Sequence, residues 1–86
     1  MPWTVTVEKS ALRGLSRIPK GERERIGAVL ASMEADPFGG DLKYLRNDPR
    51  GAYRRRVGSW RIIFDADMQG HMIHVKAITR RTSTTY

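Results

Sequence analysis

Apolar and polar residues alternate strictly at the start of the chain. Positions 3, 5 and 7 are Trp, Val and Val, whereas positions 4, 6 and 8 are Thr, Thr and Glu. A period of two is typical of a β-strand that buries one of its faces. We therefore predict a first strand over residues 3–8.

The next thirty residues change to a helical period. Ser10 is the expected N-cap of a short helix whose apolar side carries Leu12, Leu15 and Ile18, and Pro19-Lys20-Gly21 ends it. A second helix is predicted from Glu22 to Asp36, because apolar residues recur there at i, i+3, i+4 and i+7. These residues are Ile26, Val29, Leu30 and Met33. The short connection predicts that the two helices pack antiparallel as a helical hairpin.

Three further strands are predicted in the second half of the chain. Residues 52–57, 60–65 and 71–79 are rich in β-branched and aromatic side chains, and short turn-forming segments separate them. Residues 37–40 are expected to form a loop and residues 47–51 a turn, with Leu42 and Leu45 between them filling the core. The order β-α-α-β-β-β predicts an α+β domain over residues 1–86. Its helical hairpin would cover one face of a mostly antiparallel sheet of about four strands.

Composition narrows the class of protein. A chain of 86 residues with 40% hydrophobic content can bury one core but not two. It has no apolar run of about eighteen residues and no secretory signal at its start, so we expect a cytoplasmic protein that makes no membrane contact. It has no cysteine, which excludes disulfides, a thiol nucleophile and a thiolate metal site.

The net charge is +7 and the pI is about 10.6, which favours a polyanionic partner. Residues 1–36 hold six Lys or Arg against five Asp or Glu, whereas residues 37–86 hold ten against four. The excess positive charge therefore lies almost entirely in the C-terminal half.

Strand alternation predicts where the arginines of this half lie. Arg54 and Arg56 share one face of their strand, and the hairpin that follows can bring Arg61 onto the same face. Clustered like charges destabilise a sheet, so the cluster predicts a bound phosphate. Arg55 points toward the core side, where it must extend past the helix layer or mark a bulge.

The most specific motif is Tyr53-Arg54-Arg55-Arg56-Val57-Gly58-Ser59-Trp60-Arg61-Ile62-Ile63-Phe64. It follows Asp36-Pro37 and Leu42-Lys43-Tyr44-Leu45, and it precedes a hydrophobic strand and the segment from Ala77-Ile78-Thr79-Arg80-Arg81 to Tyr86. In these motifs the chain resembles the RelE/ParE toxin superfamily from end to end. The resemblance implies the same β-α-α-β-β-β fold. Proteins of the RelE branch cleave messenger RNA in the ribosomal A site, and a labile antitoxin neutralises them.

The resemblance also implies a catalytic set. The two basic strand residues of the RelE branch fall on Arg54 and Arg56, its transition-state arginine on Arg61, its tail arginine on Arg80 and its tyrosine on Tyr86. Arg81 is the alternative to Arg80. Better-studied RelE proteins carry lysines at the first two positions, and a guanidinium cannot act as a general base. Tyr86 is then the candidate base among the matched residues, or it stacks on a nucleobase.

The predicted function is that of a type II toxin: a ribosome-dependent, metal-independent endoribonuclease that inhibits translation through attack of an RNA 2′-hydroxyl. No cofactor is implied. The expected partners are messenger RNA, the ribosome with its 16S rRNA at the A site, and a RelB-like antitoxin. The residues expected to bind RNA are Arg54, Arg55, Arg56, Arg61, Lys76 and Arg81.

Other interpretations stay open. ParE-type proteins of the same fold poison DNA gyrase, and a non-enzymatic RNA-binding module would need only the basic surface. His71 and His74 are interpreted as a turn residue and a strand residue, because no carboxylate stands at a spacing that gives either a catalytic role. Trp60 is expected in the core, or as a stacking platform if the sheet is more open.

Overall fold

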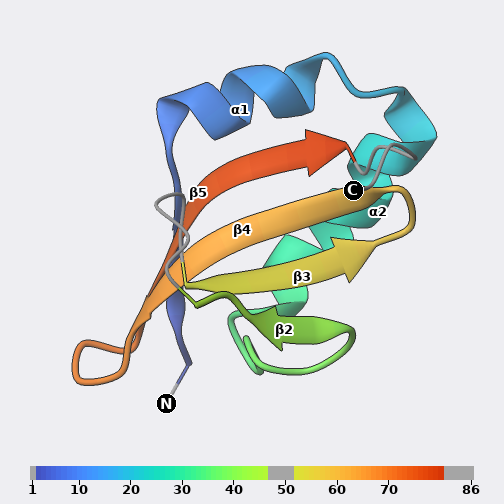
Figure 1. Ribbon diagram of the computed structural model, residues 1–86. Coiled ribbons are helices and arrows are strands. Elements are labelled where there is room, and N and C mark those ends of the chain that lie inside the picture. Colours follow the sequence, from blue (N-terminus) through green and yellow to red (C-terminus); the bar gives the residue numbers. More distant parts are fainter. Residues whose placement is uncertain (1, 47–51, 81–86) are drawn as a thin grey trace.

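A five-stranded sheet forms the centre of the computed structural model, which describes residues 2–46 and 52–80 (Figure 1). In spatial order its strands are β1 (Thr4–Val7), β5 (Met72–Arg80), β4 (Trp60–Asp67), β3 (Tyr53–Val57) and β2 (Leu42–Tyr44). The pairing of β1 with β5 is parallel, and the pairings β5–β4, β4–β3 and β3–β2 are antiparallel. The predicted α+β fold with a mostly antiparallel sheet is therefore confirmed.

The sheet has one strand more than the sequence pattern predicts. Residues 42–44, for which no strand is predicted, form the edge strand β2 and pair with β3. Leu42 packs against the core as expected, but Lys43 and Tyr44 are exposed. Three residues are too few to show an alternating pattern, so only the backbone pairing with β3 identifies this strand.

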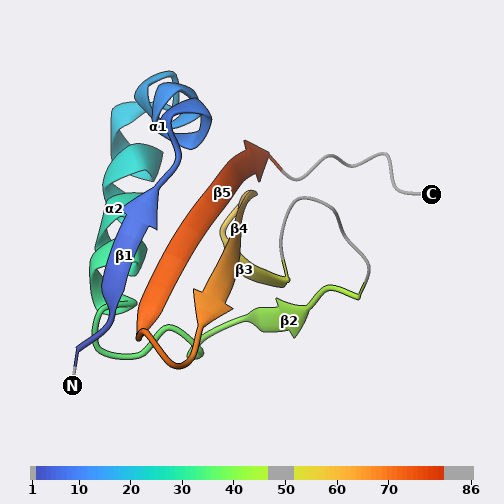
Figure 2. The same cartoon turned by 90° about the vertical axis from the view of Figure 1, so that its left-hand side faces the viewer.

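Both helices, α1 (Lys9–Ser16) and α2 (Lys20–Ser32), lie on the same side of the sheet (Figure 2). The chain turns back between them, so the predicted helical hairpin on one face of the sheet is confirmed, although the two views show α2 running obliquely to α1 rather than strictly antiparallel to it. Pro19 is the N-cap of α2 with φ −53° and ψ 148°, and this extended residue redirects the chain beside the buried Ile18. Neither helix is long and apolar enough to cross a membrane, and the described ranges contain no other helix.

The predicted apolar side of α1 is buried only in part: Leu15 packs against the core and Ile18 is buried in it, whereas Leu12 is not. Ser10 is not its N-cap, because Glu8 holds that position without a side-chain cap bond. Leu12 is 50% exposed, whereas Ala11 is buried. A Cβ placed on Gly14 would lie 3.8 Å from the backbone oxygen of Ile78 in β5. The small residues of α1 thus face the sheet and let the helix approach β5 closely.

The hydrophobic core lies between the helices and the sheet. Ile26 and Met33 are fully buried, as the helical period of α2 predicts. They pack with core residues from β3, β4 and β5, namely Val57, Ile62, Phe64, Ile73, Val75 and Ile78. Trp3, Val5 and Val7 pack against this core from β1 and the residue before it, which confirms their predicted common face.

Gly40 provides a test of the loop before β2. Its φ is +75°, and an added Cβ would lie 2.5 Å from the Arg55 guanidinium. Gly40→Ala should therefore lower the free energy of unfolding by about 1–2 kcal/mol, through backbone strain and displacement of Arg55. Urea unfolding measures this change. Gly21→Ala is the control, because it lies in α2 with nothing within 4 Å of its added Cβ. A Gly40→Ala variant with the same free energy of unfolding as the unmodified protein would contradict the prediction.

Candidate nucleic-acid interface

The sheet face opposite the helices carries the candidate site. Pairing of β3 with β4 sets Arg56 directly opposite Arg61 and Arg54 directly opposite Ile63. Directly opposite residues project to the same face, so Arg54, Arg56 and Arg61 share the face away from the helices. We call these three residues the arginine cluster. The register thus brings together the three residues that strand alternation predicts to converge.

The arginine cluster has buried donors that lack partners. All three side chains are partly buried, and fully buried Ile63 lies among them on the same face. Within residues 2–46 and 52–80, the Nε atom of each of the three arginines is inaccessible to solvent and has no hydrogen-bond partner. A buried donor without a partner destabilises the fold. A ligand with several acceptor oxygens, such as a phosphate, would bind the outer guanidinium nitrogens and would relieve this cost only if the side chains shift to expose Nε.

Asp41 partly balances the charge of the cluster. Its Oδ2 atom lies 3.4 Å from Nε of Arg56, an ion pair without hydrogen-bond geometry, and its backbone oxygen accepts a bond from the Arg56 backbone N at 2.9 Å. The Asp41 side chain is 55% exposed, so water screens this pair. An incoming phosphate would compete with Asp41 for Arg56.

Two lysines extend the positive face beyond the cluster. Lys43 in β2 pairs with Arg54 and is exposed. Alternation within β3 and β4 does not predict that Lys43 lies on this face, because Lys43 belongs to another strand. Lys76 lies where the β4–β5 register shifts, and its Nζ is 4.0 Å from Oδ2 of Asp65. The other carboxylate oxygen of Asp65 accepts a bond from the backbone N of Ala52 at 2.9 Å. Asp65 is therefore a half-exposed strand residue whose carboxylate contacts Lys76 and the backbone before β3.

The structure does not bring two predicted residues to this face. Arg55 pairs with Ile62 on the helix side, and its guanidinium extends to Gly40. Arg80 pairs with Trp60, also on the helix side, and its Cζ lies 5.9 Å from the centroid of the Trp60 ring. Arg55 thus extends past the core as expected, but neither it nor Arg80 joins the arginine cluster. Arg81 and Tyr86 lie outside the described residues.

The histidines take the structural positions expected of them. His71 lies in the β4–β5 turn with φ 53° and stacks on Trp3, with ring centroids 4.5 Å apart. His74 lies in β5, with Nδ1 2.7 Å from Oγ1 of Thr6 and Nε2 3.6 Å from Oε1 of Glu8. His74 pairs with Asp65, whereas Ala77 pairs with Ile63 in the row of Arg54, so His74 lies three positions along β5 from the nearest row of the cluster. Residues 2–46 and 52–80 contain no group of three metal-ligating side chains.

The chain is similar to known proteins over nearly its whole length. No protein-family model matches the chain. It is 29% identical over 87 residues to a protein named toxin RelE from Mycobacterium tuberculosis, an alignment that covers 96% of this chain and 86% of that protein. Because the similarity runs through nearly the whole of both chains, the resemblance to the RelE/ParE superfamily is confirmed.

Solved structures share the fold. A chain of the archaeal RelE–RelB complex from Pyrococcus horikoshii superposes with a TM-score of 0.85 at 22% identity, covering 98% of this chain and all of that one. A chain of the toxin–antitoxin complex RelBE2 from Mycobacterium tuberculosis superposes with a TM-score of 0.82 at 21% identity, and the superposition covers 94% of this chain and all of that one. The isolated Escherichia coli RelE toxin superposes with a TM-score of 0.76 at 13% identity, and the superposition covers 95% of this chain and 87% of that one. At these identities the superpositions establish the fold alone.

Proposed function

We propose, from the resemblance to RelE toxins in sequence and fold, that this protein is the toxin of a type II toxin–antitoxin system. It would act in the cytoplasm as a ribosome-dependent endoribonuclease that cleaves messenger RNA in the A site. The observation that carries the proposal is the arginine cluster, with three buried Nε donors that lack partners on a face free of helices. A scissile phosphate would bind the outer guanidinium nitrogens of these partly exposed arginines, and it would reach the Nε donors only after the side chains shift.

In the proposed reaction the arginines stabilise the negative charge of the transition state, and no metal ion takes part. The RNA 2′-hydroxyl loses its proton and its oxygen attacks the adjacent phosphorus, while the bond to the 5′-oxygen breaks and that oxygen takes up a proton. Negative charge builds on the non-bridging oxygens, where Arg61, Arg54 and Arg56 would stabilise it. Their side chains are partly buried and preorganised, which makes the interaction stronger than in water. Alignment of the messenger by the ribosome would contribute the in-line geometry.

The roles of the C-terminal residues are tested separately. Arg80 is separated from the cluster by the sheet, so to reach a leaving group its side chain must first leave Trp60. Arg81 is the alternative arginine, and Tyr86 is proposed as base or stacking residue. Cleavage assays on Arg80→Ala, Arg81→Ala and Tyr86→Phe distinguish these roles. Tyr86→Phe removes the hydroxyl that would act as a base but keeps the ring that would stack. Lost cleavage would therefore support the base, and retained cleavage would support stacking.

A RelB-like antitoxin is the proposed protein partner. The support is that chains of RelE–RelB complexes superpose on this protein over nearly its full length. An acidic or amphipathic segment of such an antitoxin would cover the basic face or the helices. Copurification with a small protein encoded nearby tests the pairing. Release of translation inhibition by that protein would support it, and continued inhibition by the bound complex would contradict it.

In vitro translation tests the enzymatic activity. The purified protein is added to a translation reaction, and messenger 5′ ends are mapped with and without an antibiotic that stalls the ribosome. We expect cuts only within translated regions and only while ribosomes are present. Gyrase-dependent DNA breaks in place of RNA cuts would support the ParE-type alternative. If the protein shows neither activity, the result would indicate a non-enzymatic binding module.

Neutralising Asp41 should strengthen RNA binding. Asp41→Asn removes the carboxylate that lies 3.4 Å from Arg56 Nε, which leaves this arginine available to phosphate. Because the pair is exposed, we expect a gain of roughly two- to fivefold in affinity for a single-stranded RNA at low salt. Fluorescence anisotropy measures the change. Glu34→Gln, an equal charge change at an exposed position after α2, is the control. Equal gains in both variants would contradict a local effect of Asp41.

A further inference from the structure

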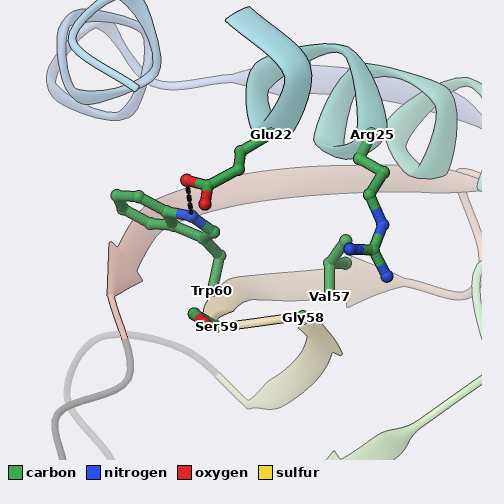
Figure 3. A pocket seen from close by; sticks show the side chains of 6 residues that line it. All are labelled: Glu22, Arg25, Val57, Gly58, Ser59 and Trp60. Carbon is green, nitrogen blue, oxygen red and sulfur yellow. Dashed lines mark hydrogen bonds between the residues drawn. The ribbon is translucent and has the colours of Figure 1, made fainter. Parts of the chain in front are cut away.

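A small polar pocket of about 90 Å³ lies between α2 and the turn that joins β3 to β4 (Figure 3). It lies on the helix side of the sheet and is separate from the arginine cluster. Its lining residues are Glu22, Arg25, Val57, Gly58, Ser59 and Trp60. The proposed mechanism assigns none of these residues a role.

The pocket has walls of opposite charge. Glu22 and Arg25, three residues apart in α2, both extend toward the turn. Oε2 of Glu22 accepts a hydrogen bond from Nε1 of Trp60 at 2.9 Å. Arg80 lies 5.9 Å from the Trp60 ring centroid, so contacts with both residues hold the indole. Val57 is buried between these walls.

Two hydrogen-bonding groups remain available to a ligand. Within residues 2–46 and 52–80, Oε1 of Glu22 accepts no hydrogen bond, and no ion pair joins Glu22 to Arg25. Gly58 has φ +59°, and a Cβ placed on it would lie 3.3 Å from Nη1 of Arg25. The glycine therefore lets the guanidinium lie close to the turn. The pocket offers an acceptor on one side and planar donors on the other.

We infer that this pocket binds a single unpaired guanine base of RNA. Guanine carries two acceptors, O6 and N7, on one edge, which a guanidinium can bind with two hydrogen bonds. The adjacent edge carries the N1–H and N2–H donors, which a carboxylate oxygen can accept. Adenine places an amino group where Arg25 needs an acceptor, and cytosine lacks the acceptor pair. Unpaired bases are commonly bound in this way, between side chains that contact their edges and faces.

The location deepens the proposed function, on which this part of the inference rests. The Val57–Trp60 pair directly follows the Arg56–Arg61 pair toward the turn, and it projects to the opposite face. An RNA strand whose phosphate lies on Arg56 and Arg61 can therefore pass around Gly58 and Ser59. A guanine close to the cleaved phosphate would enter the pocket, which makes Glu22 and Arg25 specificity-determining residues.

Binding of mononucleotides to the purified full chain tests the pocket without ribosomes. The indole N–H resonance of Trp60 is followed by NMR during titration with GMP, AMP, CMP and UMP. We expect saturable shifts with GMP and at least about fivefold weaker binding of the other three. Glu22→Gln keeps an oxygen for the Trp60 bond but replaces the second oxygen with an amino group, so GMP binding should weaken on the order of tenfold. Arg25→Ala should weaken it similarly.

Glu24→Gln is the matched control, because it is an exposed position on the same helix outside the pocket. It should bind GMP like the unmodified protein. No preference for GMP, or equal binding by Glu22→Gln and Glu24→Gln, would overturn the inference. Mapping of cut sites in translated messenger gives the second readout. Glu22→Gln should lose cuts beside guanines selectively, and an unchanged cut profile would overturn the specificity role.

The two assays separate the two failures. GMP binding that depends on Glu22 in a protein that cuts no messenger would refute the proposed endoribonuclease but retain the guanine pocket. Messenger cleavage without GMP binding would retain the endoribonuclease and refute the pocket.

Discussion

Replacing Arg61 with alanine should abolish messenger cleavage and growth inhibition. Arg61 lies opposite Arg56 in the β3–β4 hairpin, is partly buried and has an Nε donor without a partner. Removing one preorganised donor to a developing oxyanion lowers the rate by about 10²–10³-fold. Because Arg61 is central to a charge cluster, we expect a loss at the upper end of this range. Single-turnover cleavage on programmed ribosomes measures the effect.

Three variants control for charge and folding. Arg13→Ala removes the same charge from the exposed surface of α1 and should retain cleavage. Arg61→Lys keeps the charge but loses the planar donor pair, so its rate should fall between those of Arg61→Ala and the unmodified protein. Arg61→Ala should still bind the antitoxin, which shows that it folds. Cleavage retained by a folded Arg61→Ala variant would refute the assignment of Arg61.

Phe64→Ala should cause the largest loss of stability among single core substitutions. Phe64 is fully buried at the centre of β4, and its ring stacks on Tyr53 with centroids 5.4 Å apart. Truncating a buried phenylalanine costs about 3–5 kcal/mol, through lost burial and the cavity that remains. Small domains have only about 5–15 kcal/mol of stability, so the variant should be close to unfolding at 37 °C. Urea unfolding followed by far-UV circular dichroism measures the loss.

Met68→Ala is the control for this prediction. Met68 lies in the β4–β5 turn and is 53% exposed, so its truncation should change the free energy of unfolding by less than about 0.5 kcal/mol. Similar midpoints for the Phe64 and Met68 variants would contradict the proposed core. A lower midpoint with an unchanged urea slope for Phe64→Ala would support it.

Local patterns determine much of this fold. The period of two in β1, β3 and β4 correctly predicts which residues face the helices, because strand geometry fixes that alternation within one segment. The same rule predicts the common face of Arg54, Arg56 and Arg61. The helical period of α2 predicts buried Ile26 and Met33. The resemblance to RelE proteins rests on sequence motifs and needs no coordinates.

Local rules fail where a position depends on distant segments. Helix α1 exposes Leu12 and buries Ala11, because close approach to β5 favours the smaller side chain at the contact. The arrangement of the two helices likewise depends on how each packs on the sheet. A short connection between helices restricts their crossing but does not determine it.

The sequence by itself determined the fold class, the strand faces and the arginine cluster. Tertiary structure alone decided that Lys43 joins the arginine face, that Arg80 lies against Trp60 on the opposite face, and that Glu22 bonds to Trp60. Alternation depends on residues two apart in one strand, whereas these contacts depend on the pairing register and on a helix packed 38 residues away in sequence. Contacts between separate elements form only when the chain packs, so no local periodicity encodes them.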